Sequence, residues 1–257
     1  MVGLDQLATD LSRLGQELCP VAKALAESGH RYSVIGATAI LLHGYNIIRA
    51  TRDVDLVIAI EGGFPAAKNL LVGVGLQPTS ISHRFETTYG MQVDALPIAD
   101  ADTEQQLITT PEGGSLSALG LSEAIRFSVA YEIGACSVSV ATVPILIALK
   151  LTAAVERNRS DLADCCVCLS EYEREEARRY VAHSDHESAL TYDTSGAYLA
   201  GADLLRNGGA QLVGATHEAL TQLMSAEIPL IRAARSLGTN EGVPLALLQA
   251  FSLGMEP

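Results

Sequence analysis

One short segment constrains this sequence more than any other feature. Residues 53–60 read Asp-Val-Asp-Leu-Val-Ile-Ala-Ile. Because successive residues of a β-strand point to opposite faces of a sheet, Val54, Leu56 and Ile58 would form one wholly apolar face. The other face begins with two carboxylates, Asp53 and Asp55. Like charges two residues apart repel each other, so the pattern favours a hard divalent cation such as Mg²⁺ between them.

The alternative for this pair is a solvated entrance to the strand, with Arg49 and Arg52 balancing the charge. The residues before the strand favour a built site instead. Residues 32–35 form an apolar strand, Gly36 makes a turn, and a short apolar helix covers about residues 38–43. A strand, a glycine turn and a short helix therefore precede the acidic strand.

These residues carry a resemblance to a known family. Gly36 after an apolar strand, the helix ending in His43-Gly44 and the run from Arg49 to Leu56 resemble the core of the nucleotidyltransferase superfamily built on the DNA polymerase β fold. Within it the chain looks most similar to the minimal nucleotidyltransferases grouped with the AbiEii-type toxins. The family usually has Gly-Gly or Gly-Ser where this chain has Gly36-Ala37. That departure removes a hydroxyl, although Thr38 follows directly.

The resemblance implies an α/β (α+β) fold with a mixed sheet flanked by helices. We expect a catalytic domain over residues 1–170, including an amphipathic N-terminal helix at about residues 4–28. Residues 171–257 contain helical segments interrupted by glycine and proline, which predicts a small C-terminal helical bundle.

Asp94 is the third acidic residue of interest, because it lies in the apolar strand Met-Gln-Val-Asp-Ala-Leu-Pro, where a charge needs a reason. It either pairs with a nearby arginine or, as the resemblance implies, completes the acidic site. In the second case Asp53, Asp55 and Asp94 are the catalytic residues and the ligands of two Mg²⁺ ions, which stabilise the α-phosphate and activate the attacking hydroxyl.

The resemblance also implies residues that bind the nucleotide. Lys150 is the only charge in the apolar run from Ile145 to Val155, where it either extends from a packed helix toward solvent or neutralises a triphosphate. Asp161 either caps the next helix or orients Lys150; Asp164 is a weaker candidate for that role. The predicted nucleotide-binding residues are Gly36, Ala37, Thr38, Arg52, Lys150 and Asp161.

Composition limits the partners. The 257 residues carry a formal net charge of −13, which disfavours binding to extended nucleic acid. No apolar run reaches the roughly 20 residues of a membrane helix, and the N-terminus lacks the basic start of a signal peptide. Cys165, Cys166 and Cys168 read as buried helix thiols, which fits a reducing compartment. We therefore expect a cytoplasmic protein without a membrane partner.

Two further patterns are interpreted as solvent-exposed residues without a functional role. Asp100 and Asp102 form a second Asp-x-Asp, but it lies in a polar loop and we expect it to be solvated. His183 and His186 read as a solvated helix end.

Two functions follow. The first is Mg²⁺-dependent transfer of a nucleoside monophosphate from an NTP to a hydroxyl of RNA, a protein or a small molecule, as in a toxin-type enzyme. The second is a non-catalytic protein of the same fold that acts as a partner in a toxin–antitoxin pair, or assembles with a second copy of itself. Ala37 favours the second function slightly, whereas Asp53, Asp55, Asp94 and Lys150 together favour the first.

Overall fold

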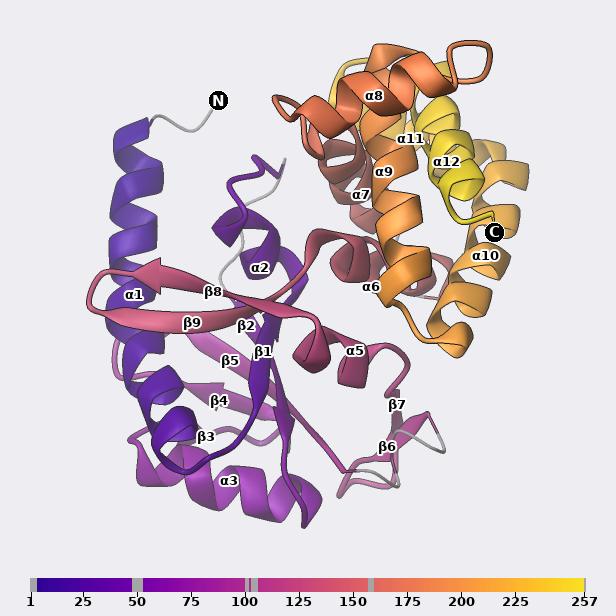
Figure 1. Ribbon diagram of the computed structural model, residues 1–257. Coiled ribbons are helices and arrows are strands. Elements are labelled where there is room, and N and C mark those ends of the chain that lie inside the picture. The colour runs from indigo at the N-terminus through magenta and orange to yellow at the C-terminus, as the bar shows by residue number, and fades with distance from the viewer. Residues whose placement is uncertain (1–3, 48–52, 100–101, 103–105, 157–159, 257) are drawn as a thin grey trace. The chain divides into compact units, whose positions relative to one another are not determined.

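The computed structural model describes residues 4–47, 53–99, 102, 106–156 and 160–256 (Figure 1). The chain divides into two compact units, Met1–Leu42 with Thr51–Ala141 and His43–Ala50 with Thr142–Pro257. We call them the sheet unit and the helical unit. The predicted domain boundary at residue 170 falls inside a helix of the helical unit, α7 (Ser160–Glu171).

The sheet unit contains a seven-stranded mixed sheet in the order β3-β4-β5-β2-β1-β9-β8. β2 lies at the centre, antiparallel to β1 and parallel to β5, while β1 is parallel to β9. The mixed α/β fold class predicted from the sequence is confirmed. The strands are β1 (Tyr32–Ile35), β2 (Asp53–Ala59), β3 (Gln77–Pro78), β4 (Arg84–Glu86), β5 (Gln92–Ile98), β8 (Ser128–Ile133) and β9 (Cys136–Ala141).

Helices cover both faces of this sheet. Leu56 and Val57 are neighbours on β2 and so point to opposite faces, yet both are fully buried. α1 packs on β8 and β9, α5 packs on β1, β2 and β9, and α3 packs on β5. β6 and β7 form a separate two-stranded sheet. The bounds are α1 (Leu4–Glu27), α2 (Gly36–Leu42), α3 (Gly63–Gly73), α5 (Leu121–Arg126), β6 (Leu107–Thr109) and β7 (Ser115–Ser117).

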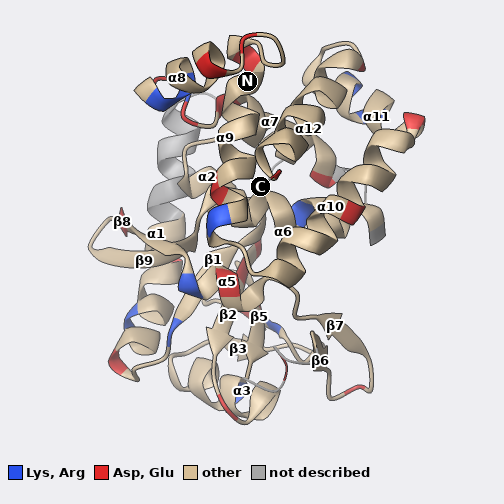
Figure 2. Cartoon of the chain, turned by 45° about the vertical axis from the view of Figure 1, so that its right-hand side comes forward, with Lys and Arg blue, Asp and Glu red and all other residues tan. Residues whose placement is uncertain are grey.

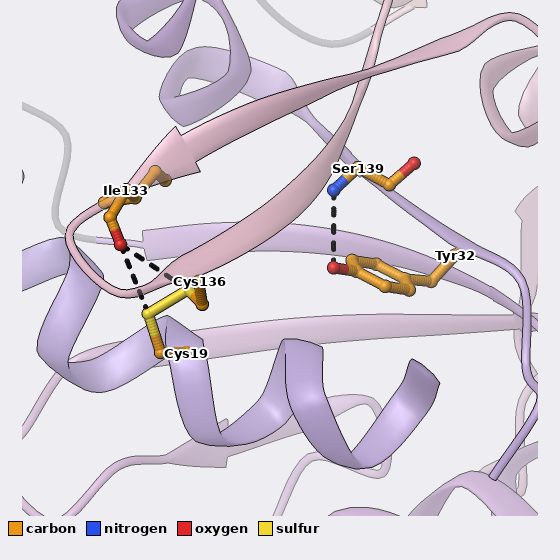
Figure 3. The surroundings of a disulfide bond; sticks show 5 residues. All are labelled: Cys19, Tyr32, Ile133, Cys136 and Ser139. Carbon is orange, nitrogen blue, oxygen red and sulfur yellow. Dashed lines mark hydrogen bonds between the residues drawn. A yellow bond between two sulfur atoms is a disulfide. The ribbon is translucent and has the colours of Figure 1, made fainter. Parts of the chain in front are cut away.

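A disulfide joins α1 to the sheet. Cys19 on α1 is bonded to Cys136 at the start of β9, 117 residues away (Figure 3). The carbonyl oxygen of Ile133 lies 3.4 Å from the sulfur of Cys19 and 3.6 Å from that of Cys136. Since a disulfide sulfur carries no proton, we interpret these as close contacts. Beside them, the backbone N–H of Ser139 donates a hydrogen bond to the hydroxyl of Tyr32 at 3.3 Å.

The disulfide bears on the expected location of the protein. Cys165, Cys166 and Cys168 are free and buried, as predicted. The expectation of a reducing compartment rested on those thiols, whereas a disulfide is typical of oxidising surroundings. A cytoplasmic location therefore stays a prediction. Across the described residues, no helix has both the length and the apolar character that spanning a membrane requires.

The helical unit packs its helices through small residues and one buried arginine. A side chain at Gly201 on α9 would lie 2.1 Å from the carbonyl oxygen of Phe251 on α12, so glycine lets the two helices touch backbone to backbone. Arg179 on α8 is 1% exposed and donates to four backbone carbonyls at the end of α7 and the start of α9. The bounds are α6 (Val143–Glu156), α8 (Ala177–Asp185), α9 (Tyr192–Asn207), α10 (Ala210–Ser225), α11 (Glu227–Leu237) and α12 (Gly242–Gly254).

Charges are dispersed along both units. In Figure 2 the basic residues of the described elements occur singly or in short groups, and they form no continuous stripe along a helix or strand. Binding to phosphates along a nucleic acid needs such a basic footprint. The expectation that extended nucleic acid is not a partner is consistent with this distribution and stays a prediction.

Candidate active site

Three charged residues stand in register across neighbouring strands. Asp55 on β2 is the partner of Asp94 on β5, and Asp94 is the partner of Arg84 on β4. Residues opposite each other on paired strands project from the same face of the sheet. Asp53, two residues before Asp55, projects from that face as well. We call Asp53, Asp55 and Asp94 the acidic row.

Gly36 fixes the position of one member of the row. This residue begins α2 directly after β1 and has a φ of 72°, in the left-handed region. A Cβ atom at this position would lie 2.0 Å from Oδ2 of Asp55. Only glycine combines this backbone conformation with so close an approach of the carboxylate. The glycine predicted to receive a phosphate is therefore also the residue that makes room for Asp55.

Thr38 holds α2 against the acidic strand. Its hydroxyl donates a hydrogen bond of 2.7 Å to the backbone carbonyl of Asp53, and its side chain is buried. Ala37 is buried too. The hydroxyl that could have replaced the one missing at position 37 is thus engaged with the backbone. A direct role of Ala37 and Thr38 in nucleotide binding stays a prediction.

The guanidinium group of Arg84 binds the carboxylate of Asp94 in a bidentate manner. Nε donates to Oδ1 and Nη2 donates to Oδ2, each at 2.7 Å. The side chains are 31% and 13% exposed, respectively. The hydrogen bond to Asp94 raises the pKa of Arg84, burial opposes it, and attraction to Asp94, Asp53 and Asp55 adds to the rise. Of the two readings of Asp94, the pair with a nearby arginine is the one that this structure contains.

The acidic row suits Mg²⁺ in its chemistry, because carboxylate oxygens are the ligands that a hard divalent cation prefers. Two adjacent parallel strands also bring Asp55 and Asp94 to the same level. However, over the described parts of the chain, no three His, Cys, Asp or Glu side chains gather closely enough to hold an ion. The donor set fits the metal, but the three carboxylates do not converge in this arrangement.

Lys150 lies in the helical unit and is engaged with two carboxylates. Its Nζ donates to Asp161 at 2.8 Å and to Asp164 at 3.0 Å, and the residue is only 7% exposed. Burial acts to lower its pKa, but the attraction of both aspartates outweighs burial and raises it. The predicted pairing of Lys150 with an aspartate is present, through both candidates. Its contact with a nucleotide stays a prediction.

Arg49, Arg52 and Asp100 lie outside the described residues. Asp102 was predicted to be a solvated loop residue, but it is helical and half-buried, and it accepts a hydrogen bond from the backbone N–H of Ala99 at 2.9 Å.

The two histidines in Ala-His-Ser-Asp-His-Glu have local partners. A ring nitrogen of His183 lies 3.2 Å from the carbonyl oxygen of Leu190, and the ring of His186 lies against Tyr198. Neither belongs to a metal-binding group among the residues that the structure describes.

Arg84 was missed as a site residue, although the sequence contains a signal for it. Gly90 is a typical turn residue between two strand-like segments, and a hairpin pairs residues at equal distances from its turn. Counting five residues outward from Tyr89 gives Arg84 on one strand and Asp94 on the other, which is the observed register.

Comparisons with known proteins find distant likenesses. No protein-family model matches the sequence, and no curated protein matches it either. The solved structure of an antigenic nucleotidyltransferase-like protein from Paracoccidioides brasiliensis is 18% identical, with a TM-score of 0.43, over 94% of this chain and 98% of that one. The antibiotic-resistance factor ANT(2'')-Ia is 17% identical, with a TM-score of 0.36, over 66% of this chain and 95% of that one.

A third likeness is to a chain in the E. coli MS115-1 CdnC:HORMA-deltaN complex. It is 13% identical, with a TM-score of 0.30, over 85% of this chain and 65% of that one. Each of the three TM-scores is below 0.5, so none of these likenesses establishes a function for this chain.

Proposed function

We propose that this chain is a nucleotidyltransferase that uses Mg²⁺ to transfer a nucleoside monophosphate from an NTP to a hydroxyl acceptor. The observation that carries the proposal is the acidic row, with Asp55 and Asp94 in register on adjacent parallel strands and Asp55 placed against the Gly36 turn. Carboxylates at the ends of neighbouring strands behind a glycine turn also match the family that the sequence resembles.

Each residue of the row has a role in this proposal. Asp53 and Asp55 would hold the metal, and Asp94 would join them once its carboxylate turns from Arg84 toward the ion; Thr38 anchors the backbone carbonyl of Asp53 and so keeps the start of the strand in place. When bound at these oxygens, Mg²⁺ supplies charge stabilisation for the α-phosphate and lowers the pKa of the attacking hydroxyl. Asp94 orients that hydroxyl and accepts its proton on a carboxylate oxygen. Lys150 is proposed to neutralise the phosphates, with Asp161 orienting it.

A titration of each NTP, with and without Mg²⁺, tests the proposal. The proteins compared are the wild type and an Asp53→Ala/Asp55→Ala variant. We expect metal-dependent heat of binding in the wild type and none in the variant. A control variant, Glu61→Ala/Glu132→Ala, removes two exposed carboxylates from the same unit and should bind like the wild type.

Two observations favour the alternative of a non-catalytic partner protein. Arg84 already takes both oxygens of Asp94, and Ala37 departs from the family pattern. Typical KM values of enzymes reach up to about 1 mM. If the wild type binds no NTP at concentrations of about 1 mM, the enzyme proposal is refuted. A protein partner would then be the function to pursue.

A further inference from the structure

The contact between Arg84 and Asp94 is built into the sheet. The two residues are direct partners on the antiparallel strands β4 and β5, so the backbone itself brings them together. Both oxygens of the carboxylate are used, at 2.7 Å each. Two parallel charge-assisted hydrogen bonds are among the stronger polar contacts in proteins, and arginine is the residue whose geometry allows them.

The guanidinium also acts on the rest of the acidic row. Asp53 and Asp55 both attract it electrostatically, in addition to its direct bonds with Asp94. Three carboxylates projecting from one face at adjacent positions repel each other, and a cation beside them reduces that repulsion. Arg84 therefore supplies, from within the chain, part of the charge compensation that a divalent cation would supply.

From this arrangement we infer that Arg84 is an internal counter-ion that competes with the divalent cation for Asp94. The inference rests on the proposed function, because it concerns how the metal of that site is admitted. A cation that takes Asp94 as a ligand must share its two oxygens with the guanidinium group or displace one or both of these hydrogen bonds, and either reduces the charge available to the cation. Arg84 thus weakens metal binding and stabilises the acidic row when the metal is absent.

A purely structural ion pair would behave differently. Its removal would lower stability by a similar amount with or without metal, and it would leave metal affinity unchanged. Competition makes two linked predictions instead. Loss of Arg84 lowers stability in the absence of metal, and it strengthens metal binding, so added metal restores more stability to the variant than to the wild type.

The experiment is a calorimetric titration of Mn²⁺ and of Mg²⁺ into the metal-free full chain, with thermal unfolding measured in parallel. The variants are Arg84→Gln, which removes the charge, and Arg84→Lys, which keeps it without the two-armed contact. One hydrogen bond to a charged group is worth about a factor of ten in an equilibrium constant, so we expect Arg84→Gln to bind the metal at least about tenfold tighter than the wild type. Arg84→Lys should fall between Arg84→Gln and the wild type, and it provides the comparison if Arg84→Gln does not fold.

Arg31→Gln is the matched control. Arg31 is an exposed arginine directly before β1, in the same unit, and Asp55 pairs with the far end of that strand. Arg31 lies four residues before Ile35, the residue that pairs with Asp55, and four residues of extended chain span about 13 Å. The control should keep the metal affinity of the wild type, whereas an equal gain in the control would mean that only net charge matters and would overturn the inference.

The outcomes separate this inference from the proposed function. If the wild type binds metal and NTP through Asp53 and Asp55 but both Arg84 variants bind metal no tighter, the inference fails and the proposed function stands. If neither the wild type nor the variants bind metal, both fail. Tighter binding in both Arg84 variants with an unchanged Arg31→Gln control supports the inference.

Discussion

Replacing Gly36 by alanine tests how far the glycine turn positions the acidic row. The new Cβ atom would lie 2.0 Å from Oδ2, 2.9 Å from Cγ and 3.3 Å from Cβ of Asp55. The first two distances are shorter than real Cβ contacts, and the third is tighter than most of them. The carboxylate of Asp55 must therefore turn away from residue 36. The substitution therefore changes both the backbone energy and the place of Asp55.

The expected cost has two parts. Holding an alanine at a φ of 72° costs about 1–2 kcal/mol. Moving Asp55 out of the way costs about 1–3 kcal/mol, as in other overpacked sites. We therefore expect Gly36→Ala to lower the free energy of unfolding by about 2–5 kcal/mol, the sum of these two ranges.

Gly29→Ala separates the two parts. Gly29 has a φ of 71°, almost the same as Gly36, but a Cβ atom there would meet nothing within 4 Å. This control should lose only the backbone part, about 1–2 kcal/mol. The assay is urea unfolding followed by circular dichroism at far-ultraviolet wavelengths, with both variants also made in an Asp55→Ala background.

In that background Oδ2 and Cγ are gone and only the contact with Cβ of residue 55, at 3.3 Å, remains, so Gly36→Ala should cost little more than Gly29→Ala. A double-mutant cycle therefore gives a coupling of about 1–3 kcal/mol between Gly36 and Asp55. If Gly36→Ala and Gly29→Ala lose the same stability in the wild-type background, the close approach of Asp55 has no energetic weight and the reasoning is wrong.

Three further predictions concern other parts of the molecule. Replacing Cys19 and Cys136 by serine should lower stability by roughly 4–5 kcal/mol, since the bond closes a loop of over a hundred residues; a reductant should then have no further effect on urea unfolding. The pKa of Lys150 is raised in the folded chain, so its contribution is complete below the reference value of 10.5 and is lost as pH rises through the folded value. Alkaline unfolding measured by circular dichroism should therefore steepen above that value, and Lys150→Met should flatten it. Gly201→Ala should destabilise the helical unit because a Cβ atom would lie 2.1 Å from a carbonyl oxygen of α12, whereas Gly214→Ala, which has open space on α10, should raise the thermal midpoint.

The sequence predicted those features that depend on local patterns. Alternation along residues 53–60 placed Val54 and Leu56 on the buried face and Asp53 and Asp55 on the other, and the strand has that burial. Pro144 stands in the first turn of α6 (Val143–Glu156), where proline is typical of a helix start. Such features follow from the period of two in strands and the capping rules of helices, which act within a few residues.

Other features depend on which distant segments meet. The bond between Cys19 and Cys136 spans 117 residues, and nothing in the spacing of the two cysteines indicates that they pair. The partners of Lys150 are on the next helix, so the sequence indicated candidates but not that both would bind it.

α12 (Gly242–Gly254) was missed for a different reason. The helical segments expected after residue 170 did not include this one, whereas the described part of that region has five helices, α8 to α12. The sequence of α12 is apolar on nearly every side, so it has little of the amphipathic period by which a helix is usually found. Its proline near the start and glycine at the end were the available signals.

The place of β9 in the sheet has a consequence for synthesis on the ribosome. β1 pairs on one side with β2, which follows closely, but on the other with β9, where Val34 meets Val140. While the chain is being made, β1 therefore keeps an open edge until more than a hundred further residues have emerged. Open strand edges are templates for pairing with other chains. A nascent chain stalled before residue 136 would expose that edge, so this protein is most prone to aggregate during the interval before β9 is translated.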